Sequence, residues 1–371
     1  MTRLYASSLM FAFALQLEAQ TSNDFIAGIQ RNFGKWDLNH DGILSSNELD
    51  TAVADPQTIG TNAAIAAALK RASRQSKVLV PPLTIENITL VTVERNPDLT
   101  QMFREGCKRI ARVTNRTLFS EKVPKLEMIH QGKLGNCFCL APLGAMVHGH
   151  PDQVAAMFAP ETNGNYWVHL GKKAVEVSPP TDAEIAMTSS NENGDIWVNL
   201  YEKAVGTARN DERAPEHRLG SPLDALAHGG SAGTMLAYLT GHEITRFSFK
   251  FAKAPASTTN NPAERFRELR QKLAAAVAEK RLMTTGTVKP STPGLTPNHA
   301  YAVLDYNEVS DTVQLWNPHG QNFHPKGLPG PETGYPTRNG IFEIPVEQFV
   351  HQFSGMAFEV VPEKLPPANM L

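Results

Sequence analysis

Cysteine is scarce in this chain, which has three cysteines, at positions 107, 137 and 139, among 371 residues. Three thiols can form at most one disulfide, and one thiol is then left over. The Cys-Phe-Cys spacing of Cys137 and Cys139 also lacks the second cysteine pair that a zinc knuckle would need. A disulfide framework and a zinc ribbon are therefore excluded, and the few cysteines become candidates for packing or for chemistry.

An excess of charge of one sign is also lacking. The 35 Lys and Arg residues face 37 Asp and Glu residues, for a formal net charge of -2, and no long basic cluster stands out. This balance predicts no nucleic-acid partner. Apolar residues make up 41% of the chain and charged residues 19%, which excludes a largely disordered protein. The length allows two or three domains of roughly 100 to 200 residues each.

A long hydrophobic run is missing after the first residues. The mainly apolar stretch from Leu4 to Leu17 is shorter than the roughly 20 residues of a membrane-spanning helix. Arg3 precedes this stretch and the small Ala19 follows it, which is the pattern of a secretory signal peptide. We therefore predict a signal peptide over 1–19, a secreted or periplasmic location and no membrane span; a buried N-terminal helix is the alternative.

Residues 37–48, "DLNHDGILSSNE", have the ligand order of a calcium-binding EF-hand loop. The expected ligands are the side chains of Asp37, Asn39 and Asp41, the backbone carbonyl of Ile43, Ser45 through water, and Glu48 with both oxygens. Gly42 takes the sharp turn, and the side chain of Ile43 is expected to pack inward. Phe25, Ile29 and Phe33 recur every four residues in a flanking helix.

We therefore predict a helical EF-hand unit over 20–75 with calcium as its ion. An acidic surface turn is the alternative. Because no second matching loop is recognisable, the pattern favours a structural or weakly binding site over a sensor. The next segment, 76–97, is rich in proline and β-branched residues and predicts a linker followed by one or two strands. A helix is expected from Pro97 to Asn115.

Cys137 lies in the stretch "QGKLGNCFCLAPLGA", where a glycine-rich turn precedes an apolar run that is expected to form a helix over 138–147. A helix N-terminus lowers the pKa of a thiol, which favours the nucleophilic thiolate. Gln131 can loop back to bind an oxyanion. Pro142 fits such a helix only near its first turn. A buried structural cysteine is the competing interpretation, and it suits Cys107 and Cys139 better.

The segment "NHAYAVLDYNEVSDTVQLWNPHG" supplies a base and a group to orient it. Two strands, 301–306 and 312–316, are joined by a polar turn. Folded as a hairpin, they set His299 opposite Asn317. A thiol, an imidazole and a carboxamide in this relation make a Cys-His-Asn site.

These motifs resemble those of the calpain family of papain-like cysteine endopeptidases. The matching stretches are "QGKLGNCF", "HAYAV" and "NPHG", with "LFSEKVPKLEMI", "IWVNLYEKAVG" and "LTGHE" in the expected order. The resemblance covers about 98–361 and implies that Cys137 is the nucleophile, His299 the base and acid, Asn317 the orienting residue and Gln131 the oxyanion donor. Three positions depart from the family pattern: Asn136 replaces Asp, while Phe138 and His319 replace Trp.

The implied fold is α+β with two lobes, a helical lobe that carries the cysteine and an antiparallel sheet lobe that carries His299 and Asn317. The catalytic domain is expected over 98–371, with a protein or peptide substrate between the lobes. The predicted function is a calcium-dependent cysteine endopeptidase that acts through an acyl-thioester on Cys137. A catalytically inactive calpain-like calcium-binding module and an acyl transfer to amines are the alternatives. His148, His150, His319 and His324 are interpreted as surface or loop residues, and Glu202 with Lys203 as a pair on a helix face.

Overall fold

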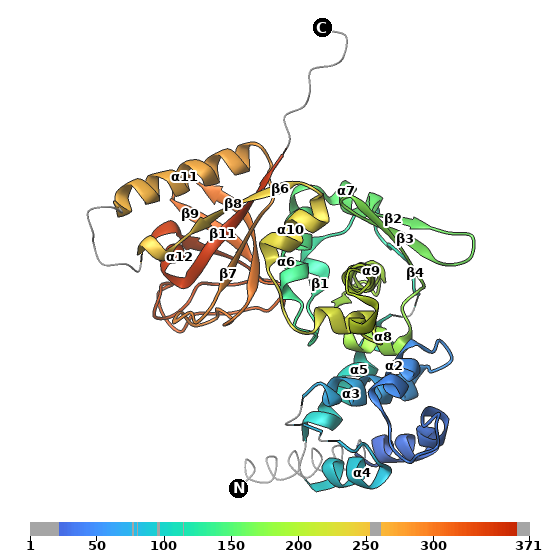
Figure 1. Cartoon of the computed structure of the whole chain (residues 1–371). Helices are drawn as coiled ribbons and strands as arrows, with labels where there is room; N and C mark the ends of the chain where they lie inside the picture. The colour runs from blue at the N-terminus through green and yellow to red at the C-terminus, as the bar shows by residue number, and fades with distance from the viewer. Residues whose placement is uncertain are drawn as a thin grey trace, which may run out of the picture.

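The computed structural model describes residues 22–361 apart from 76–77, 80, 95–96, 114 and 253–260. The predicted signal peptide, 1–19, lies outside the described residues. Figure 1 shows an N-terminal group of helices, a central helical lobe and a sheet lobe, in that order along the molecule. None of the described helices combines the length and the hydrophobicity needed to cross a membrane.

The N-terminal group consists of two helix-loop-helix units. Its helices are 22–36, α2 (Ser46–Ala54), α3 (Gly60–Ser73) and α4 (Ile85–Glu94). Phe25, Ile29 and Phe33 are all buried, which confirms the predicted apolar stripe. The two loops meet where the Leu44 amide donates to the Leu83 carbonyl at 3.0 Å. The sequence had indicated only the first of these units.

The prediction of strands within 76–97 is wrong, because residues 85–94 form helix α4. Thr84 begins this helix: its hydroxyl accepts from the Asn87 amide at 3.1 Å, and its carbonyl accepts from the Ile88 amide at 3.0 Å. Ile88 is fully buried against the other helices. The β-branched residues that suggested strands are therefore placed by capping and tertiary packing, which override local propensity.

The central lobe is mostly helical. Its helices are α5 (Pro97–Arg112), η1 (Leu126–Met128), α6 (Cys137–Gly149), α7 (Pro151–Ala156), α8 (Asp182–Met187), α9 (Trp197–Asp211), η2 (Pro215–His217), η3 (Pro222–Leu226) and α10 (Ala232–Thr240). Its strands are β1 (Ile129–His130), β2 (Phe158–Pro160), β3 (Tyr166–Leu170), β4 (Lys173–Val177) and β5 (Ser190–Asn191). Strands β2, β3 and β4 form an antiparallel sheet, and β1 pairs with β5.

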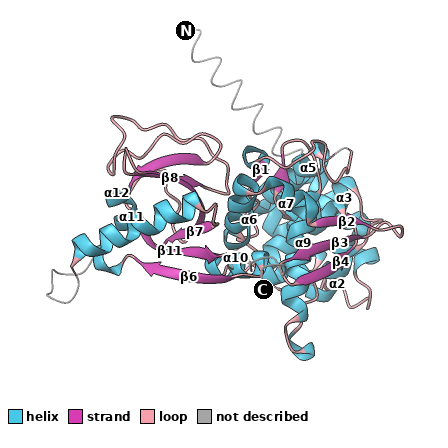
Figure 2. Ribbon diagram, turned by 90° about the horizontal axis from the view of Figure 1, so that it is seen from above, coloured by secondary structure: helices cyan, strands magenta, loops and turns pink. Residues whose placement is uncertain are grey.

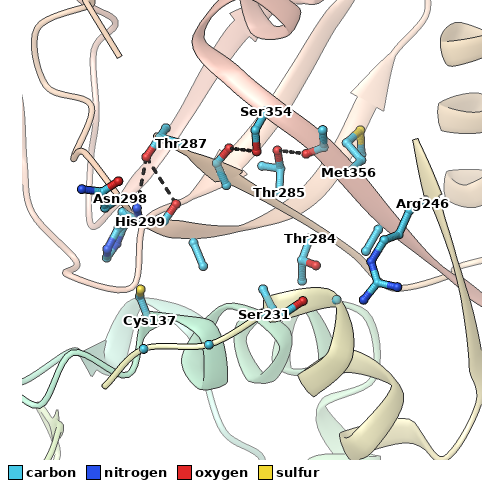
Figure 3. Close-up of a pocket in the computed structure, with 18 of the residues that line it drawn as sticks. Cys137, Ser231, Arg246, Thr284, Thr285, Thr287, Asn298, His299, Ser354 and Met356 are labelled. Carbon is cyan, nitrogen blue, oxygen red and sulfur yellow. Dashed lines mark hydrogen bonds between the residues drawn. The ribbon is translucent and has the colours of Figure 1, made fainter. Parts of the chain in front are cut away.

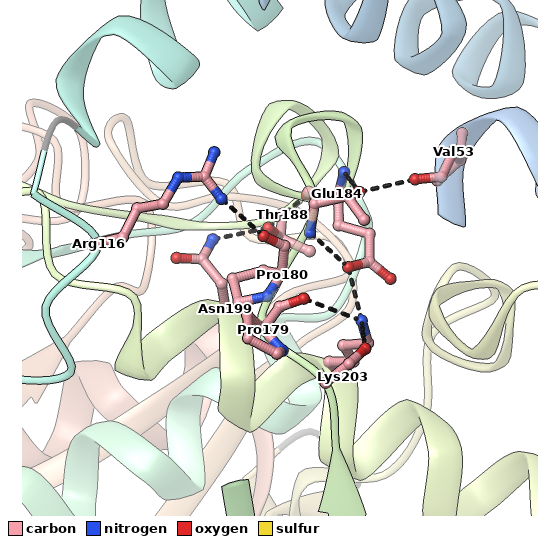
Figure 4. Close-up of polar contacts among 10 residues, drawn as sticks. Val53, Arg116, Pro179, Pro180, Glu184, Thr188, Asn199 and Lys203 are labelled. Carbon is pink, nitrogen blue, oxygen red and sulfur yellow. Dashed lines mark hydrogen bonds and ion pairs between the residues drawn. The ribbon is translucent and has the colours of Figure 1, made fainter. Parts of the chain in front are cut away.

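One hydrophobic core runs from the N-terminal helices into the central lobe. Polar contacts cross the same boundary: the Thr181 hydroxyl donates to the Val53 carbonyl at 2.6 Å, beside the ion pair of Glu184 with Lys203 at 2.8 Å (Figure 4). The buried Lys70 ammonium lies 2.5 Å from Asp50 and 2.9 Å from Asp224 of η3. The predicted boundary near residue 75 therefore does not coincide with a break in packing.

The sheet lobe is built on six antiparallel strands in the order β10-β9-β8-β7-β11-β6. Their bounds are β6 (Glu243–Ser248), β7 (Met283–Thr287), β8 (Ala300–Asn307), β9 (Thr312–Trp316), β10 (Ile341–Pro345) and β11 (Phe353–Val360). The lobe also holds η4 (Lys250–Ala252), α11 (Pro262–Ala278) and α12 (Val346–Gln352).

Strand β8 shows how the sheet is held between two layers. Tyr301 and Val303 belong to the core that the sheet shares with α11 and α12, whereas Ala300, Ala302 and Leu304 belong to the core of the helical lobe. This alternation is the period of a strand that is buried on both faces. Figure 2 shows α6 and α10 at the junction of the sheet with the helices. The predicted α+β arrangement of a helical lobe against an antiparallel sheet is confirmed in these coarse terms.

Candidate active site

Cys137 lies at a helix N-terminus, as predicted, and is itself the first residue of α6, one residue before the expected start. Its sulfur points toward His299 at the end of the sheet strands (Figure 3). Helix α6 packs against β8, and Gly144 makes the close approach possible, because a Cβ there would lie 2.2 Å from the ring of Trp316. Pro142 lies in the second turn of the helix rather than in its first. The helix continues through this buried proline with one backbone hydrogen bond fewer.

A buried carboxylate holds the turn before Cys137. Glu202 of α9 is fully buried and accepts hydrogen bonds from the Asn136 side-chain amide, from the Ser189 amide at 2.8 Å and from the Ser189 hydroxyl at 2.7 Å. Burial raises the pKa of Glu202, while these donors and the charge of Arg109 oppose the rise. The network fixes the residue that directly precedes Cys137.

The sequence analysis missed this role of Glu202. The predicted helix-face pair with Lys203 is wrong, because Lys203 binds Glu184 instead. The signal was present in the sequence: Glu202 lies four residues after Val198 and three before Val205, on the apolar stripe of α9. An ionisable residue on such a stripe needs partners in the core.

His299 and Asn317 come together as predicted: the Nε2 atom of His299 lies 2.8 Å from Oδ1 of Asn317, and both residues are buried. Strands β8 and β9 form the predicted hairpin, with Asn307 opposite Thr312. A bulge between Val303 and Asp305 shifts the register by one residue, so that Ala302 pairs with Trp316. The carboxamide therefore reaches the imidazole from the turn that follows β9.

The ring of His319 stacks on that of His299, with centroids 4.4 Å apart and planes at 20°. The His319 amide also donates to Oδ1 of Asn317 at 3.0 Å. His319 thus covers the pair of His299 and Asn317, in the place where the family pattern has Trp. An ionisable ring in place of the apolar Trp brings a second titratable group onto the imidazole of His299.

Burial sets the protonation of the thiol and of the imidazole. It raises the pKa of Cys137, although the amides of Ala300 and Phe138 lower it. It lowers the pKa of His299 to about 4, helped by the charge of His319 and opposed by the bond to Asn317. The predicted lowering of the thiol pKa by the helix N-terminus is therefore wrong for this conformation, because desolvation is larger. At neutral pH the pair consists of a thiol and a neutral imidazole.

Gln131 is tied to the same turn, because its amide donates to the Pro318 carbonyl at 2.8 Å. Its side-chain oxygen is buried without a hydrogen-bond partner. This bond brings Gln131 of the helical lobe to the residue that follows Asn317. The four predicted catalytic residues, Cys137, His299, Asn317 and Gln131, thus belong to one region of the molecule.

Cys137 and His299 line the same pocket, which has a volume of about 430 Å³. The pocket lies between the first turn of α10 with the preceding Gly229 and Gly230 on one side and strands β6, β7 and β11 on the other. It is therefore an open groove between the two lobes, with the thiol and the imidazole at one end (Figure 3). A bound peptide could pass along it.

The other two cysteines and the remaining histidines stay outside this groove. Cys139 is fully buried in the core, as predicted, and burial also raises the pKa of the partly buried Cys107. All three cysteines are free. His148 and His150 lie around the end of α6, where the ring of His150 bonds the Lys280 carbonyl at 3.0 Å.

The predicted calcium loop lies between the helix over 22–36 and α2, as expected. Asp37 and Glu48 are buried and turn into the loop from its two ends. Asp37 accepts from the amides of Asp41 at 3.2 Å and Gly42 at 2.9 Å, and Glu48 accepts from those of Leu38 and Ser45, both at 2.8 Å. Gly42 has a φ of 76°, which a residue with a side chain rarely adopts.

Two details of this loop differ from the prediction. The side chain of Ile43 does not pack inward, since it is 36% exposed, and Leu44 takes the buried place instead. Ser45 caps α2 in a reciprocal capping box with Glu48. Within 22–361, where the structure is described, no three His, Cys, Asp or Glu side chains are gathered as a metal site. The oxygen donors fit calcium in kind and order, but here the carboxylates of Asp37 and Glu48 bind backbone amides.

Comparison with known proteins gives one match. The family model described as calpain family cysteine protease matches residues 101–327, which is more than half of the chain. The matched span contains helix α6 with Cys137, His299 directly before β8, and the turn with Asn317. No curated protein matches the chain.

Proposed function

Because the chain belongs to the calpain family of cysteine proteases, we propose that it is an endopeptidase that cleaves peptide bonds through Cys137. The observation that carries the proposal is that His299, whose Nε2 lies 2.8 Å from Oδ1 of Asn317, lines the same groove as Cys137. This contact occupies one ring nitrogen and leaves Nδ1 for the thiol. The substrates are proteins or peptides that lie along the groove.

The reaction begins with transfer of the Cys137 proton to His299 as the sulfur attacks the peptide carbonyl carbon. The oxyanion that forms accepts hydrogen bonds from the Cys137 amide and the Gln131 side chain. The C–N bond then breaks, His299 gives its proton to the leaving amine, and an acyl-thioester remains. Water attacks the thioester, His299 takes the proton of the water, and the thiol is restored when the C–S bond breaks.

Asn317 has a positioning role in this scheme. Its carboxamide oxygen fixes the imidazole and stabilises the ring when it carries the second proton. Since Cys137 and His299 are both neutral at rest, the proton moves during attack rather than before it. The elevated thiol pKa also favours the second candidate, a calpain-like interaction module without catalysis, whose groove binds a partner. Labelling of the thiol distinguishes the two.

A peptide electrophile directed at thiols is expected to modify Cys137 in the full chain, because a bound peptide brings the reactive carbon to the sulfur beside its base. Peptide mapping by mass spectrometry locates the adduct. Cys137→Ala should lose it, and Cys107→Ala should keep it. Adducts that form on Cys107 alone would eliminate the enzyme and leave the interaction module. Incorporation of an added amine faster than hydrolysis would instead indicate acyl transfer.

We further propose that residues 37–48 form an EF-hand loop that binds calcium. Asp37, Asn39, Asp41 and Glu48 would supply side-chain oxygens, with the Ile43 carbonyl and a water on Ser45. When bound, the ion would supply positive charge that gathers these oxygens and fixes the loop against α2. Because α2 contacts Asp224 through Lys70, the ion would act on the stability of the protease.

The signal-peptide pattern of residues 1–19 supports a further proposal, that the protein is secreted or periplasmic.

Calcium at a large excess over its dissociation constant is expected to raise the melting temperature, because a ligand that binds only the folded state at 100 times Kd adds about 2.7 kcal/mol. Thermal unfolding with calcium, magnesium or a chelator measures this. Asp41→Asn should remove most of the calcium response, whereas Asp24→Asn, on the exposed side of the first helix, should keep it. Equal melting temperatures in calcium and chelator would refute a calcium site.

A further inference from the structure

The groove continues beyond the catalytic residues to an arginine. Cys137 and His299 lie at one end, and Arg246 of β6 lies at the other, with Thr284 of β7 between them (Figure 3). The guanidinium points back into the groove toward the first turn of α10. A peptide that presents its carbonyl to Cys137 could therefore place one of its nearby side chains against Arg246.

Small residues make this part of the groove accessible. Gly229, Gly230 and Gly233 line it, and a Cβ at Gly230 would lie 2.6 Å from the ring of Phe138. The wall is thus made of backbone packed directly on the residue after the nucleophile. An extended peptide can approach such a wall closely enough to bond its amides.

Arg246 has no carboxylate partner in the described part of the chain. Its terminal nitrogen donates to the Thr234 hydroxyl at 3.1 Å, and no ion pair of the described residues includes it. Its neighbour Phe247 faces the opposite side of the sheet, under Arg265. The positive charge of Arg246 therefore remains uncompensated where it borders the groove.

A second group in the groove also lacks a partner. The hydroxyl of Thr284 is buried without a hydrogen bond, and its residue is 1% exposed. The first turn of α10, capped by Ser231, contributes the positive end of a helix dipole at the same place. A buried hydroxyl and a helix N-terminus both suit an anionic group.

We propose that this end of the groove binds an acidic side chain of the peptide substrate, so that the enzyme prefers to cleave next to Glu or Asp. The inference rests on the proposed peptidase function. The substrate carboxylate pairs with Arg246 and accepts a hydrogen bond from the Thr284 hydroxyl. A neutral side chain leaves both groups unpaired, and a Lys side chain faces a like charge. Arg246 is thus a specificity-determining residue rather than a catalytic one.

Quenched fluorogenic peptides test the preference. In one set, Glu, Gln, Leu or Lys occupies each position near the scissile bond in turn, and kcat/KM is measured at low and high salt. At one position, Glu is expected to exceed Gln and Leu by about tenfold, the size of one charge-assisted hydrogen bond. Salt should reduce this ratio because the pair lies partly in solvent.

Variants assign the preference to Arg246. Arg246→Gln should bring the Glu to Leu ratio close to one, and Arg246→Glu should make Lys the best residue at that position. Arg267→Gln, an exposed arginine of α11 that does not line the groove, should keep the wild-type ratio. Equal kcat/KM for the Glu and Leu peptides, or a ratio that survives Arg246→Gln, would overturn the specificity alone. Failure to cleave any peptide, with Cys137 unlabelled, would overturn the peptidase function itself.

Discussion

Hydrolysis of a peptide substrate is expected to fall by about 10²- to 10⁴-fold when His299 is replaced by alanine. The thiol pKa is raised by burial, so without a base very little thiolate is present at neutral pH. Cys137→Ala should remove hydrolysis altogether, since no other thiol lines the groove among the described residues. Initial rates with a fluorogenic peptide or casein measure both effects.

Two controls separate this result from a loss of structure. Cys139→Ala changes a buried thiol two residues away and should retain activity, and each variant should keep the far-UV circular dichroism of the wild type. The pH profile gives a further readout. Because His299 acts in its neutral form and its pKa is about 4, kcat/KM should stay high down to about pH 5 and fall below it. Substantial turnover by His299→Ala at pH 7 would contradict the assigned base.

Glu202→Ala is expected to destabilise the folded protein by about 3 to 5 kcal/mol. The substitution removes the acceptor of three buried donors, from Asn136 and Ser189, and one of the two negative charges that act on the buried Arg109, the other being Glu105. Buried donors without an acceptor cost far more than the net value of the bonds they lose. Urea unfolding at pH 7, followed by circular dichroism, measures the change.

Matched substitutions sharpen this test. Glu216→Ala removes an exposed glutamate from η2 and should change the free energy of unfolding by less than about 0.5 kcal/mol. Glu202→Gln keeps the volume of the side chain but places a second amide against Asn136. Its free energy of unfolding should therefore lie between those of Glu202→Ala and Glu216→Ala. In that variant kcat should decrease more than KM changes, because the turn before Cys137 loses its anchor. If Glu202→Ala were as stable as Glu216→Ala, the buried network around Glu202 would contribute little to stability.

The sequence was sufficient for features that depend on local pattern. The hairpin of β8 and β9 could be predicted because two short apolar strands flank a polar turn, and from it the contact of His299 with Asn317 followed. The apolar stripe of Phe25, Ile29 and Phe33 and the placement of Cys137 at the N-terminus of a helix are local in the same sense. The order of the family motifs along the chain then indicated that Cys137 and the distant His299 belong to one site.

Features set by distant contacts could not be predicted in this way. Helix α4 looked like a strand because Ile, Thr and Val dominate it, and its burial against other helices decides its form. The bulge in β8 and the desolvation of Cys137 depend on what packs around them. Glu202 was misjudged for the same reason, since its partners Asn136 and Ser189 come from other parts of the chain.

The two hydrophobic cores have a consequence for motion. One core unites the N-terminal helices with the helical lobe, and the other joins the sheet to α11 and α12. The groove lies between the helical lobe and the sheet. Ala300, Ala302 and Trp316 of the sheet also pack into the first core, with the Trp316 ring against Gly144 of α6. Because these sheet residues are part of the core of the helical lobe, a rotation that widens the groove has to break close-packed contacts of that core.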